Sequence, residues 1–80
     1  MQFSEQIPTR LEIHTRLTPR EREIVILLSE GMNGPEIALR LGLTPRMVAD
    51  YRSAIRHKWD VRNTEQLIQM AIRLGIVGAE

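Results

Sequence analysis

Residues 33–46 read NGPEIALRLGLTPR, and the helix boundaries within them are the strongest indication of the fold. A cap at Asn33 or Gly34, followed by a proline and Glu36, predicts a short helix over residues 35–41. Gly42 ends that helix, and a threonine and a proline two residues later predict the start of another. Two short helices joined through a glycine-containing turn match the helix-turn-helix unit, in which the second helix lies steeply across the first.

The same capping device occurs earlier in the chain. Thr18 precedes a proline, and Glu21 follows three residues after the threonine, which is the pattern of a capping box. We therefore expect a helix over residues 19–30, with Gly31 as its left-handed stop. Its apolar residues form one stripe that should be buried: Ile24, Val25, Leu27 and Leu28.

Two further helices complete the predicted domain. The helix that begins after Thr44 can run over residues 45–59, and a turn follows at 60–63. Asn63 with Gln66 forms a further, weaker capping box, which predicts a fourth helix over residues 64–74. Four helices joined by short loops leave no room for a sheet, so the predicted fold is an all-α, four-helix domain.

The N-terminal segment, residues 1–16, is harder to interpret. Leu11 and Ile13 alternate with polar residues, which suits a short half-exposed strand, and a loose tail is the other interpretation. We treat this segment as a leader and residues 17–77 as the domain.

Composition excludes several functions. The chain has 80 residues, no cysteine and two histidines, so we expect no disulfide, no metal site and no cysteine nucleophile. Its glycines lie at helix boundaries and its acidic residues form no catalytic pair, so we expect neither an enzyme nor a cofactor. No apolar run is long enough to span a bilayer, and no signal peptide opens the chain, which predicts a cytoplasmic protein.

Charge is unevenly distributed along the chain. The net charge is +1, but residues 44–62 carry five Arg and Lys against two Asp. The segments on either side are mildly acidic. A basic segment of this kind is a modest sign of nucleic-acid binding, and an ordinary solvated helix would give the same pattern.

A helical projection divides the third helix into faces. Val48, Ile55 and Trp59 fall within one narrow arc and should face the core. The candidate residues for contact with nucleic acid lie away from the core. On the outer face they are Arg46, Ala49, Asp50, Ser53 and His57, and on the flanks they are Arg52, Arg56 and Lys58.

In a helix-turn-helix the outer face of the second helix enters the major groove. There Arg46 and Ser53 can contact base edges, while the flanking cations neutralise phosphates. Asp50 can accept a hydrogen bond from a cytosine amino group or pair with Arg46 one turn before it. The other interpretation of Asp50 is that this face does not meet DNA.

Several segments together resemble one known family, the LuxR-type or GerE-type DNA-binding domain. They are LTPREREI at 17–24, Gly31, EIALRLGLT at 36–44, Val48, Ile55, Lys58, VRN at 61–63 and Leu67. The resemblance implies that the third helix binds double-stranded DNA and that the fourth helix forms a dimer. Family members usually carry a receiver or ligand-binding domain before this one, and with only 16 residues preceding it we expect none here.

The chain departs from the family at positions that face DNA. The family's recognition helix commonly starts with Thr-Val-Lys-x-His, whereas this chain has Met47, Val48, Ala49, Asp50 and Tyr51. Gly34 and Pro35 replace a polar residue and a lysine at the start of the second helix. The scaffold matches better than the contact residues do.

The fourth helix is apolar over about 200° of arc, more than its own small core requires. We therefore expect a dimer interface drawn from Leu67, Ile68, Ala71, Ile72 and Leu74. These residues form two stripes, one of Leu67, Ala71 and Leu74 and the other of Ile68 and Ile72, and the sequence does not show which stripe is internal. Alternatively, residues 1–16 fold back and cover the surplus.

Two functions remain open at this point. The first is a sequence-specific transcription regulator that binds DNA as a small homodimer. The alternative is a protein-interaction module that pairs through the fourth helix with another LuxR-type regulator and blocks it without binding DNA.

Overall fold

The computed structural model describes residues 16–78 and contains four helices and no strand within that range. They are α3 (Pro19–Ser29), α4 (Gly34–Leu41), α5 (Pro45–Trp59) and α6 (Thr64–Arg73). The predicted all-α, four-helix fold is confirmed, and each end lies within one residue of its expected position. The predictions made for residues 1–15, including a short strand, lie outside the described residues.

The caps of α3 and α4 have the predicted geometry. The Thr18 hydroxyl accepts from the Glu21 N–H at 3.1 Å, and the Glu21 carboxylate accepts from the Thr18 N–H at 2.9 Å. Asn33 and Glu36 form the same reciprocal pair at 2.9 and 2.8 Å. Each helix start is therefore set by residues within one turn of it.

The predicted capping box of α6 is only half correct. The Asn63 side chain accepts from the Gln66 N–H at 2.8 Å, as expected. The Gln66 side chain, however, accepts from the N–H of Arg62 at 2.9 Å, one residue earlier than a capping box requires. The preceding turn begins at Asp60, which has a left-handed φ of 57°.

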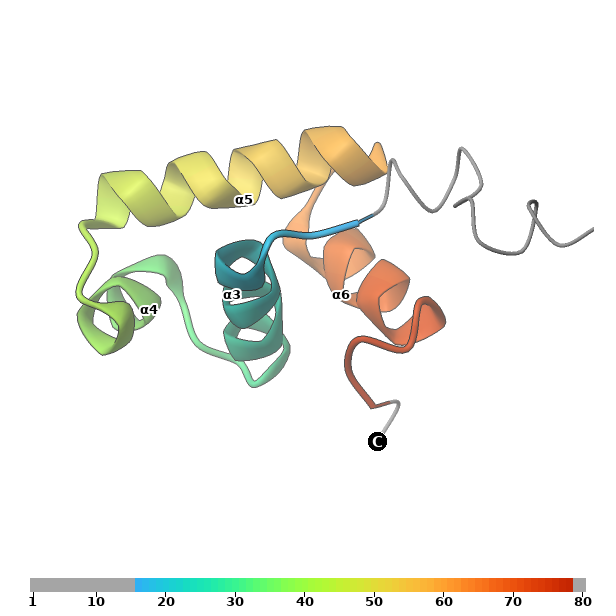
Figure 1. Ribbon diagram of the computed structural model, residues 1–80, viewed down its shortest axis with the longest axis horizontal. Coiled ribbons are helices and arrows are strands. Elements are labelled where there is room, and N and C mark those ends of the chain that lie inside the picture. The colour runs from blue at the N-terminus through green and yellow to red at the C-terminus, as the bar shows by residue number, and fades with distance from the viewer. Residues whose placement is uncertain (1–15, 79–80) are drawn as a thin grey trace, which may run out of the picture.

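The helix-turn-helix corner lies between α4 and α5. Gly42 adopts a φ of 72°, a conformation that costs glycine little, and it ends α4 as predicted. The Leu43 N–H then donates to the Ala38 carbonyl at 2.8 Å, which closes the turn. Figure 1 shows α5 lying across the three other helices, which pack beneath it.

The core is formed where α3 meets the other helices. From α5 it takes Val48, Ile55 and Trp59, which are at most 4% exposed, as the helical projection predicted. Packing of this one face against the core leaves the opposite face of α5 uncovered. The complete set of buried apolar residues is Ile24, Val25, Leu27, Leu28, Ile37, Ala38, Val48, Ile55, Trp59, Leu67 and Ala71.

Candidate nucleic-acid interface

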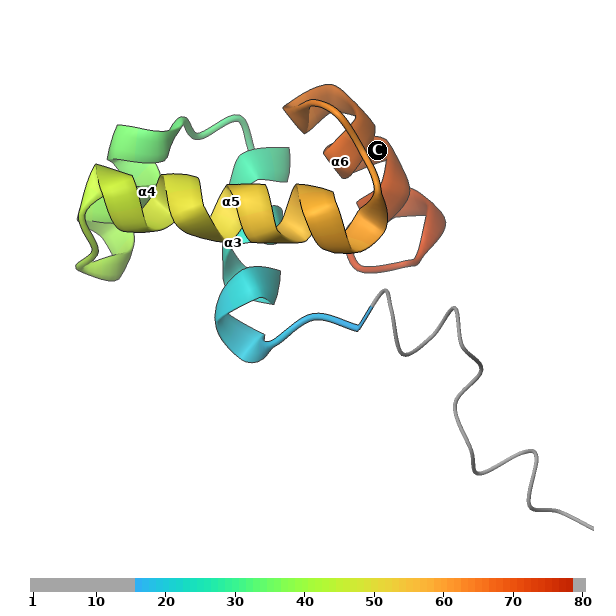
Figure 2. The same cartoon turned by 90° about the horizontal axis from the view of Figure 1, so that it is seen from above.

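The outer face of α5 is exposed along its whole length. Figure 2, seen from above, shows α5 in front of the other three helices of the described range. The five residues assigned to this face by the sequence are all exposed: Arg46, Ala49, Asp50, Ser53 and His57. The structure therefore brings these candidate residues together on one surface.

Arg46 and Asp50 form an ion pair on this face. The Arg46 Nε donates to the Asp50 Oδ1 at 3.3 Å, and the two side chains are 85% and 68% exposed. The sequence left two partners open for Asp50, a cytosine amino group or Arg46. In the structure Asp50 is paired with Arg46. The pair also cancels the charge of the carboxylate locally.

Lys58 does not extend along the flank as a free cation. Its Nζ lies 2.6 Å from the Glu21 Oε1 and donates to the Arg16 carbonyl at 3.0 Å. Burial alone would raise the pKa of Glu21. Hydrogen bonds from Lys58 and from the Thr18 backbone, with the charge of Lys58, outweigh it and lower the pKa below its usual value. Lys58 thus ties α5 to the start of α3.

Arg52 is also used within the chain. Its Nη2 donates to the Thr64 hydroxyl at 2.7 Å, which links α5 to the first turn of α6. Its Nε is buried and has no hydrogen-bond partner among residues 16–78. Arg56 is half-buried, and no hydrogen bond or ion pair holds its guanidinium within residues 16–78. Of the three flanking cations, Arg56 is therefore the one best placed to contact a phosphate.

The structure divides the apolar residues of the fourth helix only partly along the two predicted stripes, because Leu74 is exposed while Leu67 and Ala71, of the same stripe, are buried. Leu67 and Ala71 are 0% exposed, so they belong to the core of this chain and are not available to a partner. Ile68 is half-buried, whereas Ile72 and Leu74 are 37% and 38% exposed. The sequence could not decide between the stripes because both have helical spacing.

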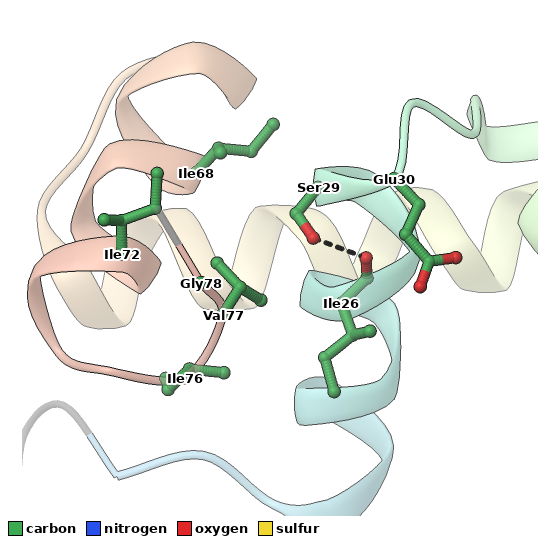
Figure 3. A pocket seen from close by; sticks show the side chains of 8 residues that line it. All are labelled: Ile26, Ser29, Glu30, Ile68, Ile72, Ile76, Val77 and Gly78. Atoms are coloured by element: carbon green, nitrogen blue, oxygen red, sulfur yellow. Dashed lines mark hydrogen bonds between the residues drawn. The ribbon is translucent and has the colours of Figure 1, made fainter. Parts of the chain in front are cut away.

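A groove of mixed polar and apolar lining lies between the second half of α3, α6 and the segment that follows α6 (Figure 3). It has a volume of about 380 Å³. The Ser29 hydroxyl donates to the Ile26 carbonyl at 2.6 Å, which satisfies this polar group within its own helix. The groove is lined by Ile26, Ser29, Glu30, Ile68, Ile72, Ile76, Val77 and Gly78.

Between residues 16 and 78 no three His, Cys, Asp or Glu residues lie close enough together to hold a metal ion. None of the four helices has the length and hydropathy needed to cross a membrane.

The turn at Gly42 between α4 and α5, together with the exposed outer face of α5, defines a helix-turn-helix domain. The chain belongs to the luxR family of bacterial regulatory proteins, whose model matches residues 15–71. The family resemblance identified from the sequence is thus confirmed. The family is one of regulators rather than enzymes.

Relatives with known names agree with this assignment. The uncharacterized response regulatory protein YgeK of Escherichia coli is 38% identical over 72 residues, which are 90% of this chain and 49% of that protein. The transcriptional regulatory protein MctR of Rhizobium johnstonii is 39% identical over 61 residues, 76% of this chain and 28% of MctR. The transcriptional regulatory protein FixJ of Azorhizobium caulinodans is 33% identical over 64 residues, 80% of this chain and 30% of FixJ.

This chain therefore spans about half the length of YgeK and less than a third of MctR and FixJ. No solved structure gives a significant match.

Proposed function

We propose that this chain is a sequence-specific DNA-binding transcription regulator that acts as a small homodimer, with α5 in the major groove. The observation that carries the proposal is the uncovered outer face of α5, which presents Arg46, Ala49, Asp50 and Ser53 from a helix-turn-helix of the luxR family. Such a regulator works in the cytoplasm, where we place this protein.

The dimensions of α5 suit this role. Its 15 residues give a length of about 22 Å, and the major groove, about 12 Å wide, admits one α-helix. Residues near the N-terminus of such a helix contact base edges. On α5 these are Arg46, Ala49 and Asp50, which fall within its first six residues. Arg56 follows near the other end, where it can contact the DNA backbone.

Transcription regulation is supported by the relatives. MctR and FixJ are transcriptional regulatory proteins by name, and the shared part of each includes the helix-turn-helix region of this chain. We extend that role to this chain because its scaffold is the same, although the start of α5 differs from the family pattern at Met47, Ala49 and Tyr51. We therefore expect this chain to bind a DNA sequence different from those bound by family members that carry the usual residues.

The homodimer is supported by the surface of α6. Ile72 and Leu74 are large apolar side chains exposed to water, and Ile68 and Ile72 form one wall of the groove beside α3. Pairing two copies through this surface would remove these side chains from water. A two-fold dimer would present two α5 helices to the two halves of an inverted repeat.

Salt-dependent binding to duplex DNA tests the proposal. The wild-type chain is titrated into a labelled random duplex at several salt concentrations, with fluorescence anisotropy as the readout. We expect binding at low salt, with an affinity that falls by a slope of about −0.9 in the logarithmic plot for each phosphate neutralised. Absence of binding at low salt would contradict the proposal and favour the interaction module.

A further inference from the structure

The Arg46–Asp50 pair has a geometry suited to reading one particular base. Arg46 is the second residue of α5 and lies on the face that we place in the groove. Its side chain is 85% exposed, more than that of Asp50. The outer-face residues around it, Ala49 and Ser53, have short side chains. The guanidinium is therefore free to reach beyond the surface of the helix.

The atom that binds Asp50 decides what Arg46 can do. The bond to Asp50 uses the Nε–H, so the two terminal amino groups remain free to donate. The carboxylate lies one turn further along the helix and restrains the guanidinium through its Nε, which leaves the two terminal amino groups for a partner outside the chain. The pair is so exposed that it contributes little to folding.

Two parallel N–H donors match guanine among the four bases. In the major groove guanine presents N7 and O6, which are both acceptors. Adenine offers one acceptor beside a donor, and the pyrimidines do not offer two adjacent acceptors. A fork held in one plane can therefore bond twice to guanine and at most once to the other bases.

We infer that Arg46 reads a guanine in each half-site and that Asp50 is a positioning residue, which holds the arginine by its Nε. This inference rests on the proposed function, because it requires α5 to enter the major groove. It also explains how a carboxylate is tolerated near DNA: Arg46 neutralises it. Removal of water at the interface strengthens the pair, since its charges then lie in a lower dielectric.

The first test uses modified bases. A preferred duplex is selected from a randomised pool with the wild-type chain, and each guanine is then replaced in turn by 7-deazaguanine, which lacks the N7 acceptor. At one guanine per half-site we expect affinity to fall about tenfold. Inosine is the matched control: it keeps N7 and O6 and loses only the minor-groove amino group, so the same position should change by less than about twofold.

The second test separates the two residues. Arg46→Ala should abolish the preference for guanine at this position, and Asp50→Ala should reduce it about fivefold or more while binding to random duplex stays level or rises. Asp50→Asn keeps an oxygen that accepts from the Nε, so it should retain most of the preference. Thermal unfolding of all three variants should match the wild type, because the pair is exposed.

The outcomes distinguish this inference from the proposed function. If the selected duplex binds tightly but 7-deazaguanine has no effect at any position, the guanine contact is wrong while the regulator stands. If Asp50→Ala keeps the full guanine preference, or instead loses a preference for cytosine, Asp50 does not position Arg46. If the wild type binds no duplex at low salt, both the regulator and the inference fail.

Discussion

Replacing Lys58 by methionine should destabilise the domain, because the structure places this ammonium on a buried carboxylate. Its Nζ lies 2.6 Å from Glu21 Oε1, and the two side chains are 27% and 9% exposed. Methionine keeps most of the apolar stem of the lysine and removes the charge. The variant therefore tests the contact and leaves the packing largely unchanged.

The expected cost follows from the burial of the pair. Removing one partner of a fully buried ion pair costs about 3–5 kcal/mol. Here Lys58 keeps some contact with water, and Glu21 keeps its bond to the Thr18 N–H, so we expect about 2 kcal/mol. For a domain of this size that lowers the melting temperature by about 8–16 °C.

Thermal and urea unfolding followed by circular dichroism at pH 7 measure this cost. The matched control is Arg20→Met, which breaks the exposed ion pair between Arg20 and Glu23 and should cost about 0.5 kcal/mol or less. If Lys58→Met is no more destabilising than the control, Lys58 is a free surface cation and the internal role given to it here is wrong.

Three further predictions concern pH, phosphate contact and the surface of α6. Because the folded state lowers the pKa of Glu21, its ionised form stabilises the domain above the unfolded pKa of about 4.3, and this stability is lost as the pH falls further. Urea unfolding of the wild type and of Glu21→Gln measures this contribution. The difference between their free energies of unfolding should shrink below about pH 4, and a difference that does not change with pH would contradict the role given to the Glu21 charge. Arg56→Ala should lower the salt slope of DNA binding by about one unit. The control is Arg73→Ala, which changes an exposed arginine on α6. Equal slopes for the two variants would show that Arg56 does not contact a phosphate. Ile72→Glu should give a folded chain that sediments as a monomer. Leu67→Glu should unfold instead, because Leu67 is 0% exposed. A wild type that is already monomeric at high micromolar concentration would count against the homodimer.

The helices were predictable from the sequence because their ends depend on local rules. Thr18, Asn33 and Thr44 each precede a proline or a glycine-proline pair, and each accepts a backbone hydrogen bond three residues on. Gly42 adopts the left-handed conformation that its place between two amphipathic segments predicted. These signals act within one turn of chain and need no knowledge of the packing.

The roles of the flanking cations were not predictable in the same way. A helical projection places Lys58 and Arg52 at the border between core and solvent, where a long side chain can turn to either side. The packing of α3 and α6 decides the direction: Lys58 meets Glu21, 37 residues away in sequence, and Arg52 meets Thr64. Only the tertiary arrangement brings these partners together.

The candidate surface of α6 was predictable only as an excess of apolar residues. The sequence showed two stripes of suitable spacing, and nothing local distinguishes the one that packs on α3. The structure buries Leu67 and Ala71 and leaves Ile72 and Leu74 partly exposed. We therefore expect an interface of α6 with a second copy to use Ile72 and Leu74, and not Leu67 or Ala71.

The most direct test of the central claim, that the outer face of α5 contacts DNA, is amide chemical-shift mapping by NMR. A ¹⁵N-labelled chain is titrated with a random duplex at low salt, and the shift of each backbone amide is followed. We expect the largest changes at residues 46–57, centred on Arg46, Ala49, Asp50 and Ser53, with small changes on α6 beyond its first turn. Changes concentrated on α6 and the groove beside α3, or no changes at all, would contradict it.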